Sequence, residues 1–167
     1  MTFGILLPFI IFVAIFILIK VLDARGRGEK DYDERQAMVR GRAAHFGYLT
    51  TLVILMPALL VYGGEHTDAA YVLTSLAFFG GLAVNAVYNI WNGGFFNLHQ
   101  NPSRYTILCF VIAALNFLTT VLRLAGGQGF WEILTDRAGT NFLLGILFAV
   151  VGVTILARRA ADRREEE

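Results

Sequence analysis

The sequence has 167 residues, of which 56% are hydrophobic and only 16% are charged, whereas soluble domains usually contain about 45–50% apolar and about 25% charged residues. This balance excludes an ordinary soluble domain and indicates lipid as the solvent. The formal net charge of +1 excludes a broad basic surface of the kind that binds nucleic acid. We therefore expect an integral membrane protein.

Five apolar stretches are long enough to be membrane helices, because about 20 helical residues cross a hydrocarbon core of about 30 Å. The first has no small-residue cleavage site after its apolar run, so we interpret it as a retained helix rather than a signal peptide. The predicted fold class is an all-α polytopic membrane helix bundle, with one transmembrane domain over residues 1–167. The five predicted spans are residues 2–22, 46–62, 69–91, 105–122 and 140–157.

The longest polar segment, residues 23–44, follows the first span and mixes both charge signs. Lys30 with Glu34, and Asp31 with Arg35, are helical neighbours four residues apart, so residues 31–43 are predicted to be helical. Two interpretations remain open: arginines that meet anionic lipid, or a docking surface for a partner. The docking candidates are Asp33, Glu34, Arg35, Gln36, Arg40 and Arg42.

The same segment contains Asp33-Glu34-Arg35-Gln36 followed by Gly41-Arg42-Ala43, directly before the second span. This pattern resembles a group of uncharacterised small multi-pass membrane proteins of Gram-positive bacteria. The resemblance covers about a tenth of the chain. It implies a multi-pass protein of the bacterial plasma membrane, and it implies no substrate or activity.

Polar residues in the third span form a stripe. Asn85, Asn89 and Asn92 are spaced four and three apart, so they share one helical face near the cytoplasmic end. They could line a polar path or bind a lipid headgroup, or they could form interhelical hydrogen bonds worth about 1 kcal/mol or less each. Asn116 of the fourth span lies nearer the outer leaflet and is predicted to be a separate contact.

Small residues at helical spacing predict surfaces where helices approach closely. Ala77 and Gly81 form such a face in the third span, and Gly145, Ala149 and Gly152 form another in the fifth. Between the fourth and fifth spans, the run from Phe130 to Leu134 predicts a short helix lying in the membrane interface.

Catalytic and metal-binding patterns are not apparent. His45, His66 and His99 have no ligand spacing, and no acid and base are placed to activate either Ser75 or Ser103. The predicted spans also contain no deep ionisable residue of the kind that marks proton relays and ion pathways. We therefore assign no catalytic residue, metal or cofactor.

The basic residues predict an orientation. All but two of the 14 Lys and Arg residues fall on one side of the five-span arrangement, and the exceptions are Arg123 and Arg137. Because basic loops are retained in the cytoplasm, we expect the amino terminus outside, and the segment 23–44 and the tail 158–167 inside.

These features favour a non-enzymatic accessory or interaction subunit of a membrane assembly, such as a transporter complex. Its expected partners are the lipid bilayer and either another membrane protein or further copies of itself. The alternative is a small oligomeric transporter or channel with a polar path lined by asparagines. A membrane-embedded enzyme acting on lipid or quinone is the third hypothesis, and the residues available to it are scattered over both sides.

Overall fold

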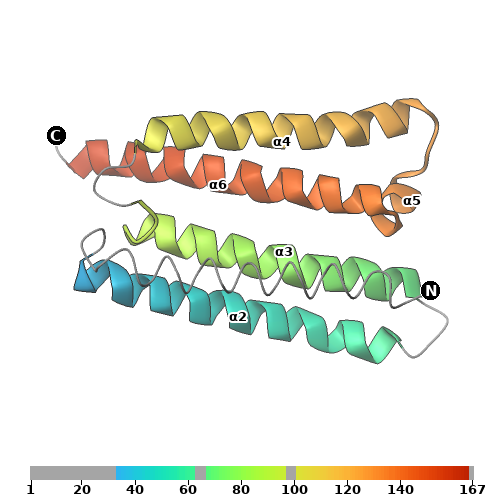
Figure 1. Cartoon of the computed structure of the whole chain (residues 1–167), viewed down its shortest axis with the longest axis horizontal. Coiled ribbons are helices and arrows are strands. Elements are labelled where there is room, and N and C mark those ends of the chain that lie inside the picture. Colours follow the sequence, from blue (N-terminus) through green and yellow to red (C-terminus); the bar gives the residue numbers. More distant parts are fainter. Residues whose placement is uncertain (1–32, 63–66, 97–100, 166–167) are drawn as a thin grey trace, which may run out of the picture. The chain divides into compact units, whose positions relative to one another are not determined.

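The computed structural model describes residues 33–62, 67–96 and 101–165. The predicted first span, residues 2–22, lies outside the described residues, as do residues 23–32 of the predicted loop 23–44. Within them the elements are all helices (Figure 1), which confirms the all-α prediction. In chain order the helices are α2 (Glu34–Tyr62), α3 (Thr67–Trp91), α4 (Pro102–Ala125), α5 (Phe130–Thr135) and α6 (Arg137–Glu165).

Four of the described helices, α2, α3, α4 and α6, are long and apolar enough to cross a membrane. The shortest of them, α4, has 24 residues and therefore extends about 36 Å, which exceeds a hydrocarbon core of about 30 Å. Each of the predicted spans over residues 46–62, 69–91, 105–122 and 140–157 lies within one of these helices. The chain is a multi-pass membrane protein.

Two helices extend beyond the predicted membrane spans into the polar segments. Helix α2 begins at Glu34, which confirms the predicted helix over residues 34–43 and joins it to the second span without a break. No proline interrupts this stretch, and Ala43 and Ala44 favour helix strongly. Similarly, α6 continues through the predicted tail to Glu165, where an ion pair of 2.8 Å joins Arg158 and Asp162 four residues apart.

Local signals explain where α4 starts and how it is connected to α6. The Asn101 side chain accepts a hydrogen bond of 2.9 Å from the Ser103 N–H, and Pro102 occupies the first turn, so α4 starts before the predicted residue 105. After α4, Gly127 adopts φ +87°, a conformation that favours glycine. The chain then forms α5, whose Ile133 is 1% exposed. This confirms the predicted short helix, and its interfacial position stays a prediction.

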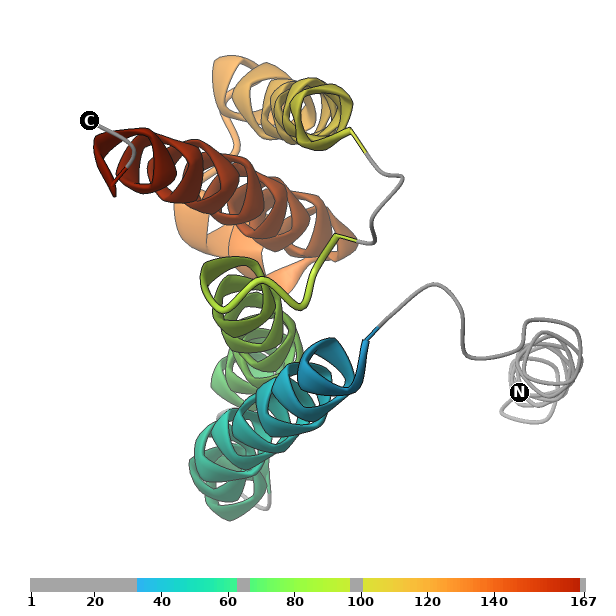
Figure 2. The same ribbon diagram turned by 90° about the vertical axis from the view of Figure 1, so that its left-hand side faces the viewer.

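The four long helices form a row in the order α2, α3, α6, α4, so α6 lies between α3 and α4 although it follows both in the chain (Figure 1). Within the described residues, α2 contacts α3 alone, and α4 contacts only α6 and the short α5. Figure 2 views the row from the end at which α2 begins. The arrangement is an open row, in which the two outermost helices do not meet.

Glycines bring α2 and α3 into close contact. A Cβ atom added at Gly47 would lie 2.7 Å from the Gly81 carbonyl oxygen, and one added at Gly81 would lie 2.7 Å from the Gly47 carbonyl oxygen. The Thr51 hydroxyl lies against Gly81 and donates to the Gly47 carbonyl oxygen at 3.1 Å. The two helices therefore cross backbone to backbone, as small residues permit in membranes.

Aromatic side chains fill the equivalent gaps between α4 and α6. A Cβ atom at Gly145 would lie 2.9 Å from the Phe117 ring, and one at Gly152 would lie 3.1 Å from the Phe110 ring. A buried apolar cluster then joins three helices near the end at which α6 finishes. Its members are Ile90 of α3, Cys109 of α4, and Val151 and Ile155 of α6.

The described arginines divide unequally between the two ends of the row. One end, called the basic end below, is where α2 and α4 begin and where α3 and α6 finish. The other end has Arg123, whose guanidinium lies 2.7 Å from the Asp136 carboxylate, and Arg137 at the start of α6. The arginines of the basic end are Arg35, Arg40, Arg42, Arg104, Arg158, Arg159, Arg163 and Arg164.

Candidate functional site

The first turn of α2 holds the segment that follows α3. The Gln36 side-chain amide donates hydrogen bonds to the carbonyl oxygens of Gly93 at 3.2 Å and Phe96 at 3.3 Å. The backbone N–H of Gly94 in turn donates to the Asn89 carbonyl oxygen at 2.8 Å. Gln36, one of the docking candidates, is therefore half-buried and used within the chain.

The other docking candidates are all exposed, and they are Asp33, Glu34, Arg35, Arg40 and Arg42. Because α2 is continuous from Glu34 onward, the four of these residues that lie on it have positions fixed relative to the membrane-spanning part of the same helix. The basic end therefore presents these charges on a rigid element rather than on a loop.

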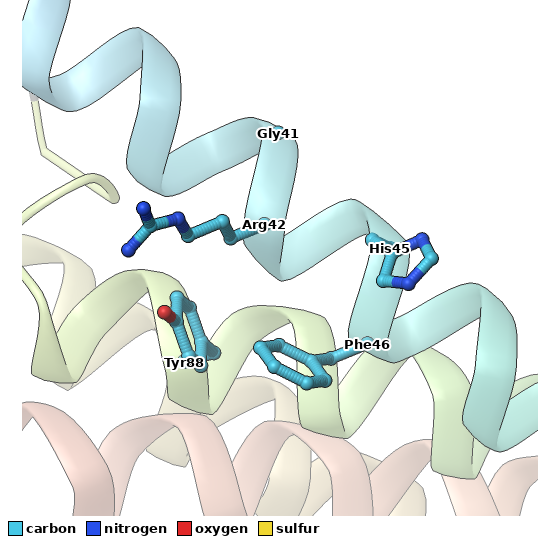
Figure 3. Close-up of a pocket in the computed structure, with 5 residues that line it drawn as sticks. All are labelled: Gly41, Arg42, His45, Phe46 and Tyr88. Carbon is cyan, nitrogen blue, oxygen red and sulfur yellow. The ribbon is translucent and has the colours of Figure 1, made fainter.

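A groove of about 460 Å³ opens between α2 and α3 beside these charges. Figure 3 shows its lining: Arg42 extends from α2 toward the part of the groove where Tyr88 lies, and His45 points away. The Phe46 and Tyr88 rings stand 5.1 Å apart between their centroids. Gly41 completes the lining.

The groove places a guanidinium beside two aromatic rings at a helix surface, whereas the His45 ring is turned away from them. Arginine binds carboxylate and phosphate oxygens through several N–H groups in one plane. The adjacent rings add an apolar wall that accommodates a side chain or an acyl segment. This chemistry suits an anionic group attached to an apolar body. Sequence analysis missed it, although Arg42, His45 and Phe46 share a helical face and signal such a surface.

The asparagine stripe of α3 is partly satisfied within its own helix. Asn89 donates from its side-chain amide to the Asn85 side-chain oxygen at 3.1 Å, and Asn92 donates to the Tyr88 carbonyl oxygen at 2.9 Å. Asn89 is 7% exposed, and its side-chain oxygen has no hydrogen-bond partner in the described part of the chain. The predicted shared face is present, and its hydrogen bonds run along α3.

Asn116 is not brought to this stripe. It lies on α4, which does not contact α3 among the described residues, and its side-chain amide donates to the Ile112 carbonyl oxygen at 2.8 Å. A polar path lined by all four asparagines is therefore not formed within the described part of one chain.

The predicted packing faces are used within the chain. Ala77 and Gly81 are buried on α3, and Gly81 faces Gly47 and Thr51 of α2. Gly145 and Gly152 receive Phe117 and Phe110 of α4, while Ala149 of the same helix is half-buried. Sequence analysis did not identify Gly47, although Ala43 and Gly47 repeat the same four-residue spacing of small residues.

The last predicted feature to compare is the set of possible metal ligands. No group of three or more His, Cys, Asp or Glu residues in the described part of the chain is arranged to hold a metal ion. His66 and His99 lie outside the described residues. Comparison with protein-family models, with curated proteins and with solved structures finds no match.

Proposed function

We propose that this chain is a non-enzymatic membrane subunit that binds another membrane protein along α2. The observation that carries the proposal is the position of α2 at the edge of an open row, where it contacts α3 alone among the described helices. Within the described part of the chain the other side of α2 meets no helix and is long enough for a partner helix, and the continuous α2 joins that side to exposed charges at the basic end.

The Arg42 groove supplies the chemistry of recognition in this proposal. A partner helix packed along α2 would place an acidic side chain of its juxtamembrane segment against Arg42, with Phe46 and Tyr88 as the apolar wall. Charge pairs of this kind fix register and partner choice more than affinity. In this proposal the basic end lies in the cytoplasm, as the positive-inside rule favours, and the membrane is the bacterial plasma membrane, as the resemblance of the segment before the second span implies.

The alternative, a small oligomeric transporter, has less support. Asn85 and Asn89 hydrogen-bond to each other, and Asn116 lies on a helix that does not contact α3. The Asn89 side-chain oxygen without a partner is the observation that favours a polar path. One buried amide oxygen is a smaller feature than the exposed face and charged beginning of α2.

Copurification from native membranes in a mild detergent tests the proposal. We expect a stoichiometric membrane protein to accompany the wild-type chain and to be lost from the double variant Arg35→Glu, Arg42→Glu. The matched control is Arg163→Glu, Arg164→Glu, which changes two exposed arginines at the same end on α6. Recovery of the bare chain alone, or equal loss in both double variants, would contradict the proposal.

A further inference from the structure

A second, smaller pocket lies at the basic end, on the other side of α3 from α2. Its volume is about 190 Å³, and it is formed where α3 ends, α4 begins and α6 approaches its last turns. It shares no lining residue with the Arg42 groove. The lining residues are Ile90, Gly93, Phe96, Pro102, Ile155, Arg158, Arg159 and Asp162.

The walls of this pocket are apolar on the membrane side and charged at the rim. Ile90 and Ile155 are 4% and 1% exposed, and both belong to the buried cluster that joins α3, α4 and α6. Arg158, Arg159 and Asp162 come from the turns of α6 beyond the predicted span. A polar rim above an apolar floor matches the change in polarity across a membrane interface.

The charges at the rim leave one guanidinium available. Arg158 is paired with the Asp162 carboxylate at 2.8 Å, whereas Arg159 forms no ion pair within the described residues. The start of α4 at Pro102 adds the partial positive charge of a helix amino terminus. The last carbonyl groups of α3 contribute little negative charge, because N–H groups of Asn92, Gly93 and Gly94 donate to them.

We propose that this pocket binds the phosphate of an anionic phospholipid headgroup, with Arg159 as its main ligand. Pockets for drug-sized molecules are usually about 300–1,000 Å³, so the measured 190 Å³ accommodates a phosphate and the adjoining glycerol carbons rather than a whole lipid. The acyl chains extend from the pocket along the apolar helix surfaces.

The charge balance favours a phosphodiester over free phosphate. A phosphate monoester carries about −1.5 to −2 charges at pH 7, which is more than one unpaired arginine neutralises. A phospholipid diester carries one negative charge, and its glycerol carbons can contact Phe96 and Pro102. The proposal concerns lipid binding by the chain itself and does not depend on the partner protein proposed above.

Native mass spectrometry of the full chain released from micelles tests the proposal. With phosphatidylglycerol as the probe, we expect one retained lipid per chain, and about fivefold less retention for Arg159→Gln. Arg163→Gln is the matched control, since Arg163 is an exposed arginine of the same helix outside the pocket. The control is expected to retain lipid like the wild type.

A variant that is expected to bind more lipid distinguishes an effect on this pocket from a loss of folding. Asp162→Asn removes the carboxylate that pairs with Arg158, so we expect retention of phosphatidylglycerol to rise about fivefold. Phosphatidylcholine, whose choline cancels the phosphate charge, is expected to be retained less. Unchanged retention in Arg159→Gln, equal loss in Arg163→Gln, or displacement of the lipid by inorganic phosphate would overturn the proposal.

Discussion

At the scale of single residues, the contact between Gly47 and Gly81 sets the separation of α2 and α3. Each glycine faces the carbonyl oxygen of the other helix, at a distance where a Cβ atom cannot be accommodated without movement. The Thr51 hydroxyl occupies the remaining space beside Gly81. The close approach therefore depends on the absence of side chains at two positions.

Substitution of Gly47 tests this contact. We expect Gly47→Ala to lower the free energy of unfolding by about 1–3 kcal/mol, because overpacking forces the two backbones apart. The matched control is Gly41→Ala on the same helix, where an added Cβ meets nothing within 4 Å. That control should be neutral or stabilise by about 0.5–1 kcal/mol, since alanine favours helix over glycine.

Unfolding in mixed micelles with increasing sodium dodecyl sulfate, followed by circular dichroism, measures the difference. Equal stability of the two alanine variants would show that the crossing of α2 and α3 tolerates a side chain at Gly47.

Sequence spacing alone predicts which residues share a face, and it does not identify their partners. Asn85 and Asn89 were expected to face one way, and they do, yet their hydrogen bond is within α3 rather than between helices. Side chains four residues apart on a helix lie close enough to pair with each other. Asparagines in such a stripe can therefore hydrogen-bond to one another within their own helix, without a second helix.

At the scale of the helix, α2 shows why the end of a membrane span is not the end of the helix. Hydropathy detects the change from water to lipid near residue 46, whereas the backbone hydrogen bonds continue back to Glu34. The charged beginning of α2 is fixed by contact as well as by helix formation, because Gln36 donates to two carbonyl oxygens of the segment after α3.

Hydrogen exchange tests this attachment. We expect Gln36→Ala to speed exchange of the Gly93 and Gly94 amides about tenfold, because each lost hydrogen bond contributes about 0.5–1.5 kcal/mol to local stability. Arg35→Ala, at the exposed neighbouring position, should leave both rates unchanged. The measurement is deuterium uptake in detergent micelles, resolved by mass spectrometry. Equal acceleration in both variants would mean that loss of helix at the start of α2, rather than loss of the contact, controls exchange.

At the scale of the whole molecule, the order of the described helices could not be read from the sequence. Four spans and their connections were predictable from apolar length, because lipid requires continuous hydrogen-bonded helices. The position of α6 between α3 and α4 was not predictable. In lipid every apolar helix face has similar solvation, so the shapes of the helix surfaces decide which helices pack together. For α4 and α6, the complementary surfaces are Phe110 and Phe117 of α4 against Gly152 and Gly145 of α6.

The distribution of arginines supports a prediction of orientation that accessibility labelling can test. On a Cys109→Ala background we expect a cysteine at Gln128 to react with a membrane-impermeant maleimide in intact cells. A cysteine at Ala37 should react only after permeabilisation. Both positions are exposed, at opposite ends of the row. The physical reason is that translocating the basic end would carry its arginines across the membrane against the positive-inside bias. Labelling of Ala37→Cys in intact cells would contradict this orientation, because it would place the basic end, with the Arg42 groove and the Arg159 pocket, on the outside.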